Sequence, residues 1–118
     1  MGGNKNTRAK GYYTSPFAGE VWLESSYELR VAQDLDANYI SWKRPEYLIW
    51  FDQRGQERKY FPDFYLPEYD VYLDPKNSYL IEQDEYKIES VRKTHNVNIL
   101  VLDANHLSWD KIKHLLHR

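Results

Sequence analysis

Two aspartates and a lysine, Asp63, Asp74 and Lys76, are spaced so that a plain β-hairpin would bring them together. Two strand-like runs flank the turn-forming residues 67–70, and a hairpin closed at that turn fixes which residues face each other. Counting outward from the turn sets Asp63 opposite Asp74, and the alternation of side chains puts Lys76 on the same face as Asp74. Like charges about 5 Å apart destabilise a sheet. The pair therefore predicts a countercharge, for which a divalent metal ion is the natural candidate.

The chemistry that fits this set is hydrolysis of a phosphodiester bond. The attacking water and the departing alkoxide must both be stabilised, and a hard cation bound through oxygen can serve both. Mg²⁺ prefers carboxylate oxygens and needs few protein groups, so Asp63 and Asp74 would be its direct ligands, and we expect Mn²⁺ to substitute. A normal lysine pKa of about 10.4 makes Lys76 a cation that orients water and phosphate rather than a base.

The pattern of Pro62-Asp63 followed by Asp74-Pro75-Lys76 resembles the Pro-Asp…(Asp/Glu)-x-Lys signature of the restriction-endonuclease-like nuclease superfamily. With three upstream segments, the chain looks like the small phage endonucleases related to homing and intron-encoded enzymes, very-short-patch repair nucleases and phage junction resolvases. Those segments are Gly11–Tyr13, Glu24–Leu29 and Trp42–Glu46. The chain departs from the pattern in having Asp as the second carboxylate, Pro75 between it and the lysine, and no zinc-finger segment.

This resemblance implies a metal-dependent DNA endonuclease, homing-endonuclease-like or nicking. It implies a core of α-β-β-β-α-β order, with a mixed sheet flanked by helices and a further helix at the C-terminus. It also implies that the backbone carbonyl of Pro75 adds a metal ligand, since proline loses a donor but keeps its oxygen. Because proline lacks a ladder N–H, this position should lie at an edge, a bulge or a strand end.

A third carboxylate could come from Glu28 or from Glu46. Ser25-x-x-Glu28 is a capping box, so Glu28 has a structural reading, whereas the resemblance makes it a helix-borne catalytic carboxylate. Glu46 competes for the role, because a hairpin closed symmetrically at residues 53–56 would set Glu46 opposite Asp63. The sequence leaves both assignments open.

Hydrophobic periodicity and turn residues predict an α/β chain that reads helix, three strands, helix, strand, helix. The last strand should run parallel to the strand that carries Asp74, through a right-handed crossover. The predicted helices cover residues 26–36, 83–94 and 109–117, and the predicted strands cover 47–52, 58–66, 71–76 and 97–102, the first three of these forming a meander.

Length and composition favour one compact domain over residues 11–118, preceded by a flexible basic arm at residues 1–10. The chain has 118 residues, of which 42% are hydrophobic, and it has no cysteine, which excludes disulfides and thiolate metal sites. We find no membrane-spanning stretch and no signal peptide, so we expect a cytoplasmic protein of a bacterium or a phage-infected cell.

A formal net charge of −2 argues against DNA binding, but the charges are unevenly distributed. Carboxylates around a metal do not report the charge of the metal-bound surface. We therefore expect DNA, duplex in the first instance, to be contacted by basic residues in the arm and around the first hairpin. These residues are Lys5, Arg8, Lys10, Lys43, Arg44, Arg58 and Lys59.

Several alternatives remain open from the sequence. The chain could be a catalytically inactive DNA-binding or assembly module on the same fold, because a fold does not guarantee activity. It could also be a structure-specific nuclease for junctions or mismatches, or an RNA-directed nuclease. Large aromatic side chains could stack on unpaired bases, although most such residues form core. The sequence defines neither the target, nor nicking against double-strand cutting, nor whether the chain acts as a homodimer.

Overall fold

A computed structural model describes residues 10–116, and within that range the chain folds into four helices and seven short strands. The predicted arm therefore lies outside the described residues, apart from Lys10. In chain order the elements are β1 (Gly11–Ser15), β2 (Gly19–Leu23), α1 (Ser26–Ala37), β3 (Leu48–Phe51), β4 (Glu57–Tyr60), β5 (Phe64–Leu66), β6 (Val71–Pro75), α2 (Ser78–Gln83), α3 (Glu85–His95), β7 (Ile99–Leu102) and α4 (Trp109–Leu116).

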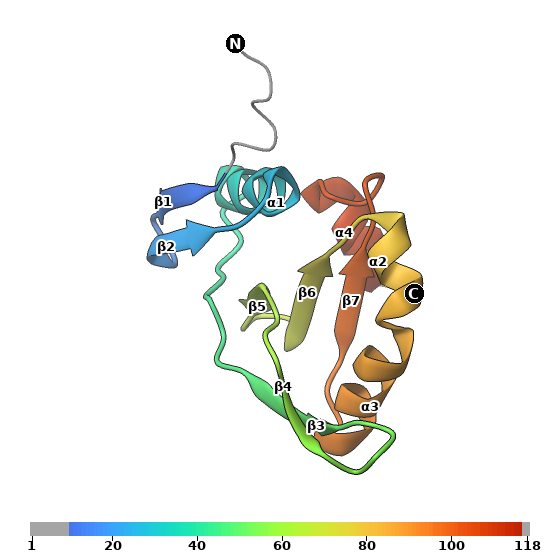
Figure 1. The fold of residues 1–118 in the computed structure, drawn as a ribbon. Coiled ribbons are helices and arrows are strands. Elements are labelled where there is room, and N and C mark those ends of the chain that lie inside the picture. Colours follow the sequence, from blue (N-terminus) through green and yellow to red (C-terminus); the bar gives the residue numbers. More distant parts are fainter. Residues whose placement is uncertain (1–9, 117–118) are drawn as a thin grey trace.

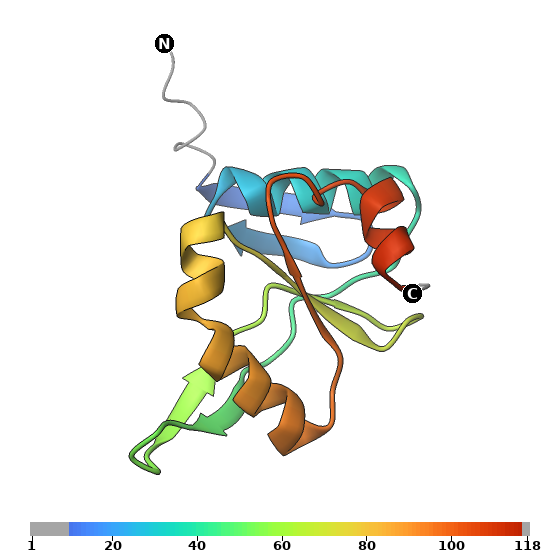
Figure 2. The ribbon, with the colours of Figure 1, turned by 90° about the vertical axis from the view of Figure 1, so that its right-hand side faces the viewer.

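The strands form three separate sheets, two of which are two-stranded hairpins. Figure 1 shows the β1–β2 hairpin beside α1 at one end of the molecule and the β3–β4 hairpin at the opposite end. The three-stranded sheet β5-β6-β7 lies between them, and α2 and α3 follow one another along its side. The view turned by 90° shows the same helices leading from the β6 end of the sheet down to the β3–β4 hairpin (Figure 2).

The central sheet is mixed, as predicted. Strand β5 pairs antiparallel with β6, with Leu66 opposite Val71 and Phe64 opposite Leu73. Strand β7 pairs parallel with β6 on its other side, so the predicted crossover through a helical segment is confirmed. An α/β fold with a mixed sheet and flanking helices is therefore what this chain forms.

The core explains why these segments take these structures. Val31 and Leu35 lie four residues apart on one face of α1 and are fully buried, and Ile88 and Val91 of α3 are likewise buried. Burial of one face fixes each helix against the sheet, and at about 25 cal/mol per Å² of apolar area this burial is the main favourable term. A tilted pair of rings, Trp42 and Phe64, packs with centroids 4.9 Å apart beside β5.

Two predicted elements are wrong in extent. The predicted strand at 58–66 is split into β4 and β5, which belong to different sheets, so the three-stranded meander does not form. Pro62 lies in the break and has no N–H to donate to a ladder. The predicted helix at 83–94 is two helices, α2 and α3, which meet at Asp84.

The β1–β2 hairpin was not predicted at all. Gly19 has φ of +76°, a left-handed conformation that favours glycine, and it closes the turn between the strands. The Ser15 hydroxyl accepts hydrogen bonds from the backbone N–H groups of Phe17 and Ala18 in the same turn. The hairpin packs Val21 and Leu23 into the core, an alternation that the sequence did contain.

The four helices between residues 10 and 116 have 6 to 12 residues each. None of the helices there is both long enough and apolar enough to cross a bilayer.

Candidate active site

Five of the residues that the sequence singled out line one cleft of about 620 Å³. Glu28 reaches it from α1, Asp63 from the segment before β5, Asp74 from β6, and Lys76 from the residue after β6. Pro75 also lines the cleft. Three separate parts of the chain thus bring together three carboxylates and a lysine.

The facing arrangement of Asp63 and Asp74 follows from the register of β5 and β6. Phe64 and Leu73 form the last pair of that ladder. Asp63 precedes Phe64 and Asp74 follows Leu73, so the two aspartates meet where the ladder ends, although Asp63 itself is outside the strand. The predicted pairing of positions is confirmed by this register.

Asp74 is compensated by neighbouring donors. Its side chain is only 4% exposed, and its Oδ2 accepts a hydrogen bond of 2.5 Å from the Tyr60 hydroxyl. The Lys76 Nζ lies 3.3 Å from the same oxygen. Burial, and then the negative charge of Asp74, raise the pKa of Tyr60 above its usual value, so this phenol remains a neutral donor.

Lys76 has a second carboxylate partner that the sequence did not indicate. Its Nζ lies 2.9 Å from Asp84 Oδ2, and Lys87 Nζ lies 3.3 Å from that same oxygen. Burial alone would lower the pKa of Lys76, but the charges and hydrogen bonds of Asp74 and Asp84 outweigh it, and the pKa rises. This environment favours the cationic form of Lys76, which is the form expected from the sequence.

Asp84 occupies a position where it would ordinarily stabilise a helix. It is the residue before α3, and aspartate at such a position commonly accepts a hydrogen bond from the first turn of the helix. Its side chain makes no such bond. Its backbone, with φ of −95° and ψ of 5°, is not the extended conformation of an N-cap, and the carboxylate contacts Lys76 and Lys87 instead.

Asp63 is less well compensated than Asp74. Its nearest cation is Arg44, whose Nη1 lies 3.7 Å from Asp63 Oδ1. Burial raises the pKa of Asp63 to about 8, with further contributions from the negative charges of Glu28 and Asp74, while Arg44 and Lys76 partly offset the increase. A carboxyl with such a pKa demands a proton or a cation at neutral pH.

Glu28 is part of a helix cap and also lines the cleft, while its catalytic role remains a prediction. Ser25 Oγ accepts from the backbone N–H of Glu28 at 3.2 Å, so the predicted helix cap is confirmed. In a standard capping box the Glu28 carboxylate would accept from the N–H of Ser25. Here Glu28 Oε1 accepts from the N–H of the preceding residue, Glu24, at 3.1 Å. The same oxygen accepts from Arg44 Nη2, also at 3.1 Å, within the cleft.

Arg44 is placed inside the site rather than on an open surface. Its Nη1 donates to the backbone oxygen of Asp63 at 2.7 Å, and its Nη2 donates to the backbone oxygen of Trp22 as well as to Glu28. The guanidinium therefore ties β2 and α1 to the segment that carries Asp63. These protein acceptors take three of the five N–H donors of Arg44, and the predicted contact of Arg44 with DNA remains a prediction.

The prediction that Glu46 faces Asp63 is wrong. In the β3–β4 hairpin Leu48 pairs with Tyr60, one position away from the register that a symmetric turn would give. The loop covers residues 52–56, an odd number, and Asp52 Oδ1 accepts hydrogen bonds within it from the N–H groups of Arg54 and Gln56. A slip of one residue moves each side chain to the other face, and Glu46 is exposed and outside the cleft.

The remaining predicted DNA contacts lie on the surface where the structure describes them. Lys10 approaches Glu24, and Arg58 pairs with Asp52 at 2.9 Å, so both have acidic neighbours. Lys43 and Lys59 lie over aromatic rings, at 5.7 Å from the centroid of Tyr65 and 4.5 Å from that of Tyr47, respectively. Lys5 and Arg8 lie outside the described residues. DNA binding by any of these residues remains a prediction.

Residues 10–116 contain no site in which three or more protein side chains could hold a metal ion. Nowhere in that range do three His, Cys, Asp or Glu side chains gather closely enough to hold an ion. Two carboxylates, Asp63 and Asp74, are nevertheless a sufficient donor set for Mg²⁺, which is often held by one or two carboxylates plus water and substrate phosphate. Buried like charges with an incomplete set of counterions are consistent with such an ion.

Pro75 ends strand β6, and the hydrogen bonds of its neighbours define the side to which its carbonyl points. The N–H groups of Tyr72 and Lys76 donate to β7, so the backbone groups of the intervening odd-numbered residues face the β5 side of β6. Pro75 is the last residue of β6 and lies beyond the end of β5, which confirms the expected strand end. Its carbonyl thus faces the side of the sheet where Asp63 lies.

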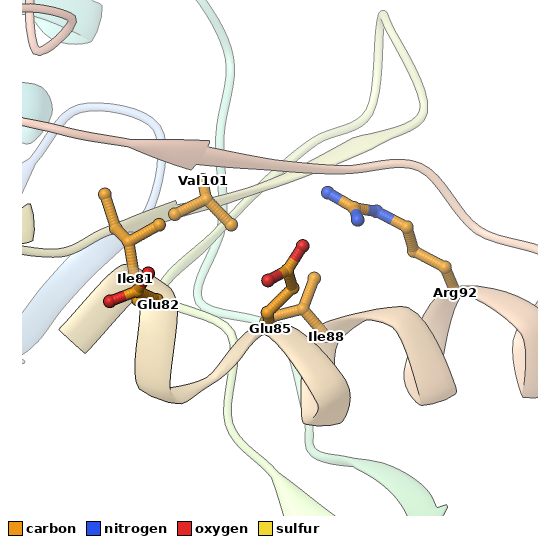
Figure 3. A pocket seen from close by; sticks show the side chains of 6 residues that line it. All are labelled: Ile81, Glu82, Glu85, Ile88, Arg92 and Val101. Atoms are coloured by element: carbon orange, nitrogen blue, oxygen red, sulfur yellow. The ribbon is translucent and has the colours of Figure 1, made fainter.

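A second hollow, of about 550 Å³, lies between α2–α3 and β7, away from these residues. Figure 3 shows Glu85 and Arg92 beside an apolar wall that includes Ile88 and Val101. Arg92 Nη2 donates to the Ile99 backbone oxygen at 2.7 Å, so this arginine serves the fold. Glu85 follows Asp84 in the chain but lines this other hollow, which makes it a useful control residue.

Three residues of the site were not predicted from the sequence. Tyr60 and Asp84 were not assigned to the site, and Arg44 was expected to contact DNA rather than Glu28 and the Asp63 segment. Tyr60 carried a weak signal, since a buried tyrosine needs a partner for its hydroxyl. Asp84 and Arg44 gave none, because their contacts depend on the packing of distant elements.

Comparisons with known proteins identify no relative. A scan against models of protein families, a search of curated proteins and a search of solved structures found no match to this chain.

Proposed function

We propose that this protein is a metal-dependent endonuclease that hydrolyses phosphodiester bonds in DNA, of the restriction-endonuclease-like kind that its sequence resembles. The observation that carries the proposal is the pair formed by Asp63, which is partly buried, and Asp74, which is almost fully buried, in one cleft with Lys76 held beside Asp74. Folding tolerates such a repulsive pair only if something compensates it, and perturbed carboxyls in a cleft are typical of functional sites.

Each residue has a role that its position supports. Asp63, Asp74 and the carbonyl of Pro75 would hold Mg²⁺, which when bound supplies positive charge to the attacking water and the departing oxygen. Lys76, held as a cation by Asp74 and Asp84, would bind and orient the phosphate that enters the cleft. Glu28, the remaining carboxylate, would act with Arg44 to hold the Asp63 segment in place.

Magnesium-dependent cleavage tests the proposal directly. The chain is incubated with Mg²⁺, with Mn²⁺, or with EDTA, and with duplex, nicked, mismatched, branched and single-stranded DNA, with RNA in a parallel series. We expect cleavage of at least one DNA with either metal and none with EDTA. The matched control is Asp70→Asn, in the turn of the same hairpin, because Asp70 has φ of +52°, a conformation that Asn also tolerates.

A catalytically inactive DNA-binding module is the second candidate. It is favoured by the finding that residues 10–116 bring no three metal-ligating side chains together. DNA binding without turnover of any substrate, with either metal, would select this candidate. No binding to DNA and no turnover would reject both.

A further inference from the structure

One aromatic side chain in the cleft is exposed to an extent that core packing does not explain. Phe61 lines the same cleft as Asp63 and Asp74, and its side chain is exposed, with 67% of the residue surface accessible. Phe64, three residues later, is fully buried. Phe61 thus leaves apolar surface in water directly beside the carboxylates, where a substrate would enter.

The ring of Phe61 is supported from one side. It packs against Tyr47 with centroids 5.8 Å apart and planes inclined by 58°, and Tyr47 is itself partly exposed. Lys59 Nζ lies 4.5 Å from the centroid of the Tyr47 ring. The result is a small surface of two rings and a cation, and this surface is continuous with the cleft through Phe61.

The chemistry of this surface fits a nucleotide. An aromatic face stacks on any base because every base has a π-face, and a neighbouring lysine attracts the phosphate of the same strand. A base within a regular duplex already has neighbours on both faces. Only a base that is unpaired and displaced from its stack can lie on a protein ring.

We propose that Phe61, supported by Tyr47, is the stacking surface for an unstacked nucleobase of DNA next to the phosphate in the cleft. The substrate class is then DNA with an unpaired nucleotide, as in a bulge or a flap, in preference to regular duplex. This inference rests on the proposed function, under which the cleft binds a phosphate of DNA. It adds a specificity determinant that the carboxylates and the lysine do not provide.

Binding measured without catalysis tests this proposal. The wild-type protein in EDTA is titrated into fluorescently labelled DNA of three kinds: a regular duplex, the same duplex with one bulged adenosine, and the duplex with a three-nucleotide flap. We expect tighter binding of bulge and flap than of regular duplex. Phe61→Ala should lose that preference by about 5- to 150-fold, the range expected for one stacked base, while its affinity for regular duplex stays near wild type.

The controls separate stacking from general damage. Phe51→Ala removes a half-exposed ring from the neighbouring β3–β4 hairpin, outside the cleft, and should keep the preference. Phe61→Trp should restore it, since a larger ring stacks at least as well. Equal binding of all three DNAs by the wild type, or an unchanged preference in Phe61→Ala, would overturn the proposal.

The same experiment distinguishes this inference from the proposed function. A Phe61-dependent preference in EDTA, with no cleavage when Mg²⁺ is added, would reject the nuclease and retain the stacking surface. Cleavage of regular duplex at the same rate as bulged DNA, together with equal binding, would reject the stacking surface and retain the nuclease.

Discussion

The two aspartates of the cleft stand in different electrostatic environments. Asp74 has Tyr60 and Lys76 within 3.3 Å of one oxygen, so its charge is compensated by the protein. Asp63 has Arg44 at 3.7 Å, and that arginine is shared with Glu28. Two residues that look equivalent in the sequence are therefore unequal in the folded chain.

This inequality shows where the site is incomplete. The unfavourable charge rests mainly on Asp63, whose pKa is raised to about 8 by burial and by the neighbouring carboxylates. The Asp74 side is arranged before any ligand binds, whereas the Asp63 side needs a proton or a cation. Four experiments can break or sharpen this contrast.

The largest expected effect is on cleavage. Asp63→Asn and Asp74→Asn should each reduce turnover at least about 1,000-fold, since each removes a direct ligand of the metal. Their stabilities should differ: at pH 8 without metal, Asp63→Asn should melt above wild type because it removes a poorly compensated charge, whereas Asp74→Asn should not. Cleavage assays with Mg²⁺ and thermal melts in EDTA measure the two effects. Near wild-type turnover in either variant would contradict the metal assignment.

The next effect is on folding. Arg44→Met should destabilise the protein by about 3 kcal/mol, because it leaves Glu28, a nearly buried carboxylate, without its cation. Arg58→Met is the control, since it removes an exposed arginine from its pair with Asp52 and should leave the melting temperature near wild type. Denaturant unfolding compares the two variants. Equal stability of both would mean that Arg44 does not hold the Asp63 side together.

A smaller loss of activity is expected at the junction of α2 and α3. Asp84→Asn should lower kcat about 10- to 100-fold with little change in KM, as expected for a neighbour that orients a catalytic group. In a Lys76→Ala background the same change should have almost no further effect, because Asp84 acts through that lysine. Glu85→Gln, which alters the adjacent carboxylate that lines the other hollow, should leave kcat unchanged. An additive double variant would refute the assignment.

The last expected effect is a pH dependence of stability. The pKa of Asp63 is about 8 in the folded, metal-free protein, against about 4 in an unfolded chain, so the folded state binds the extra proton. This contribution is fully present below pH 4 and is lost as the pH rises towards 8. The melting temperature should therefore fall between pH 5 and pH 8, and the fall should be absent in Asp63→Asn. Asp52, Asp84 and Asp103, whose pKa values are lowered, act below this window.

Local sequence rules predicted the part of the site that one hairpin makes. The register of β5 and β6, and with it the meeting of Asp63 and Asp74, follows from the alternation of buried residues such as Leu66 and Leu73. The same counting failed in the β3–β4 hairpin. There the loop, rather than a buried face, sets the register, and the side chain of Asp52 accepts hydrogen bonds within that loop.

Contacts between distant elements lay beyond the sequence. Arg44 reaches Glu28 only because the segment after α1 passes back beside the start of that helix, and nothing near either residue indicates this path. Asp84 looked like an ordinary member of one long helix. Its contact with Lys76 depends on the break between α2 and α3, which the periodicity of apolar residues did not reveal.

The β5–β6 ladder ends at the pair Phe64 and Leu73, next to the cleft. Two adjacent strands tend to extend their pairing, and here extension would carry residues 61–63 along β6 and close the hollow. Continuing the observed register, the next pair to exchange both backbone hydrogen bonds would be Pro62 with Pro75. Neither residue has an N–H, so neither of those two bonds can form. The prolines of the motif therefore act as a stop that keeps the sheet from growing over its own site.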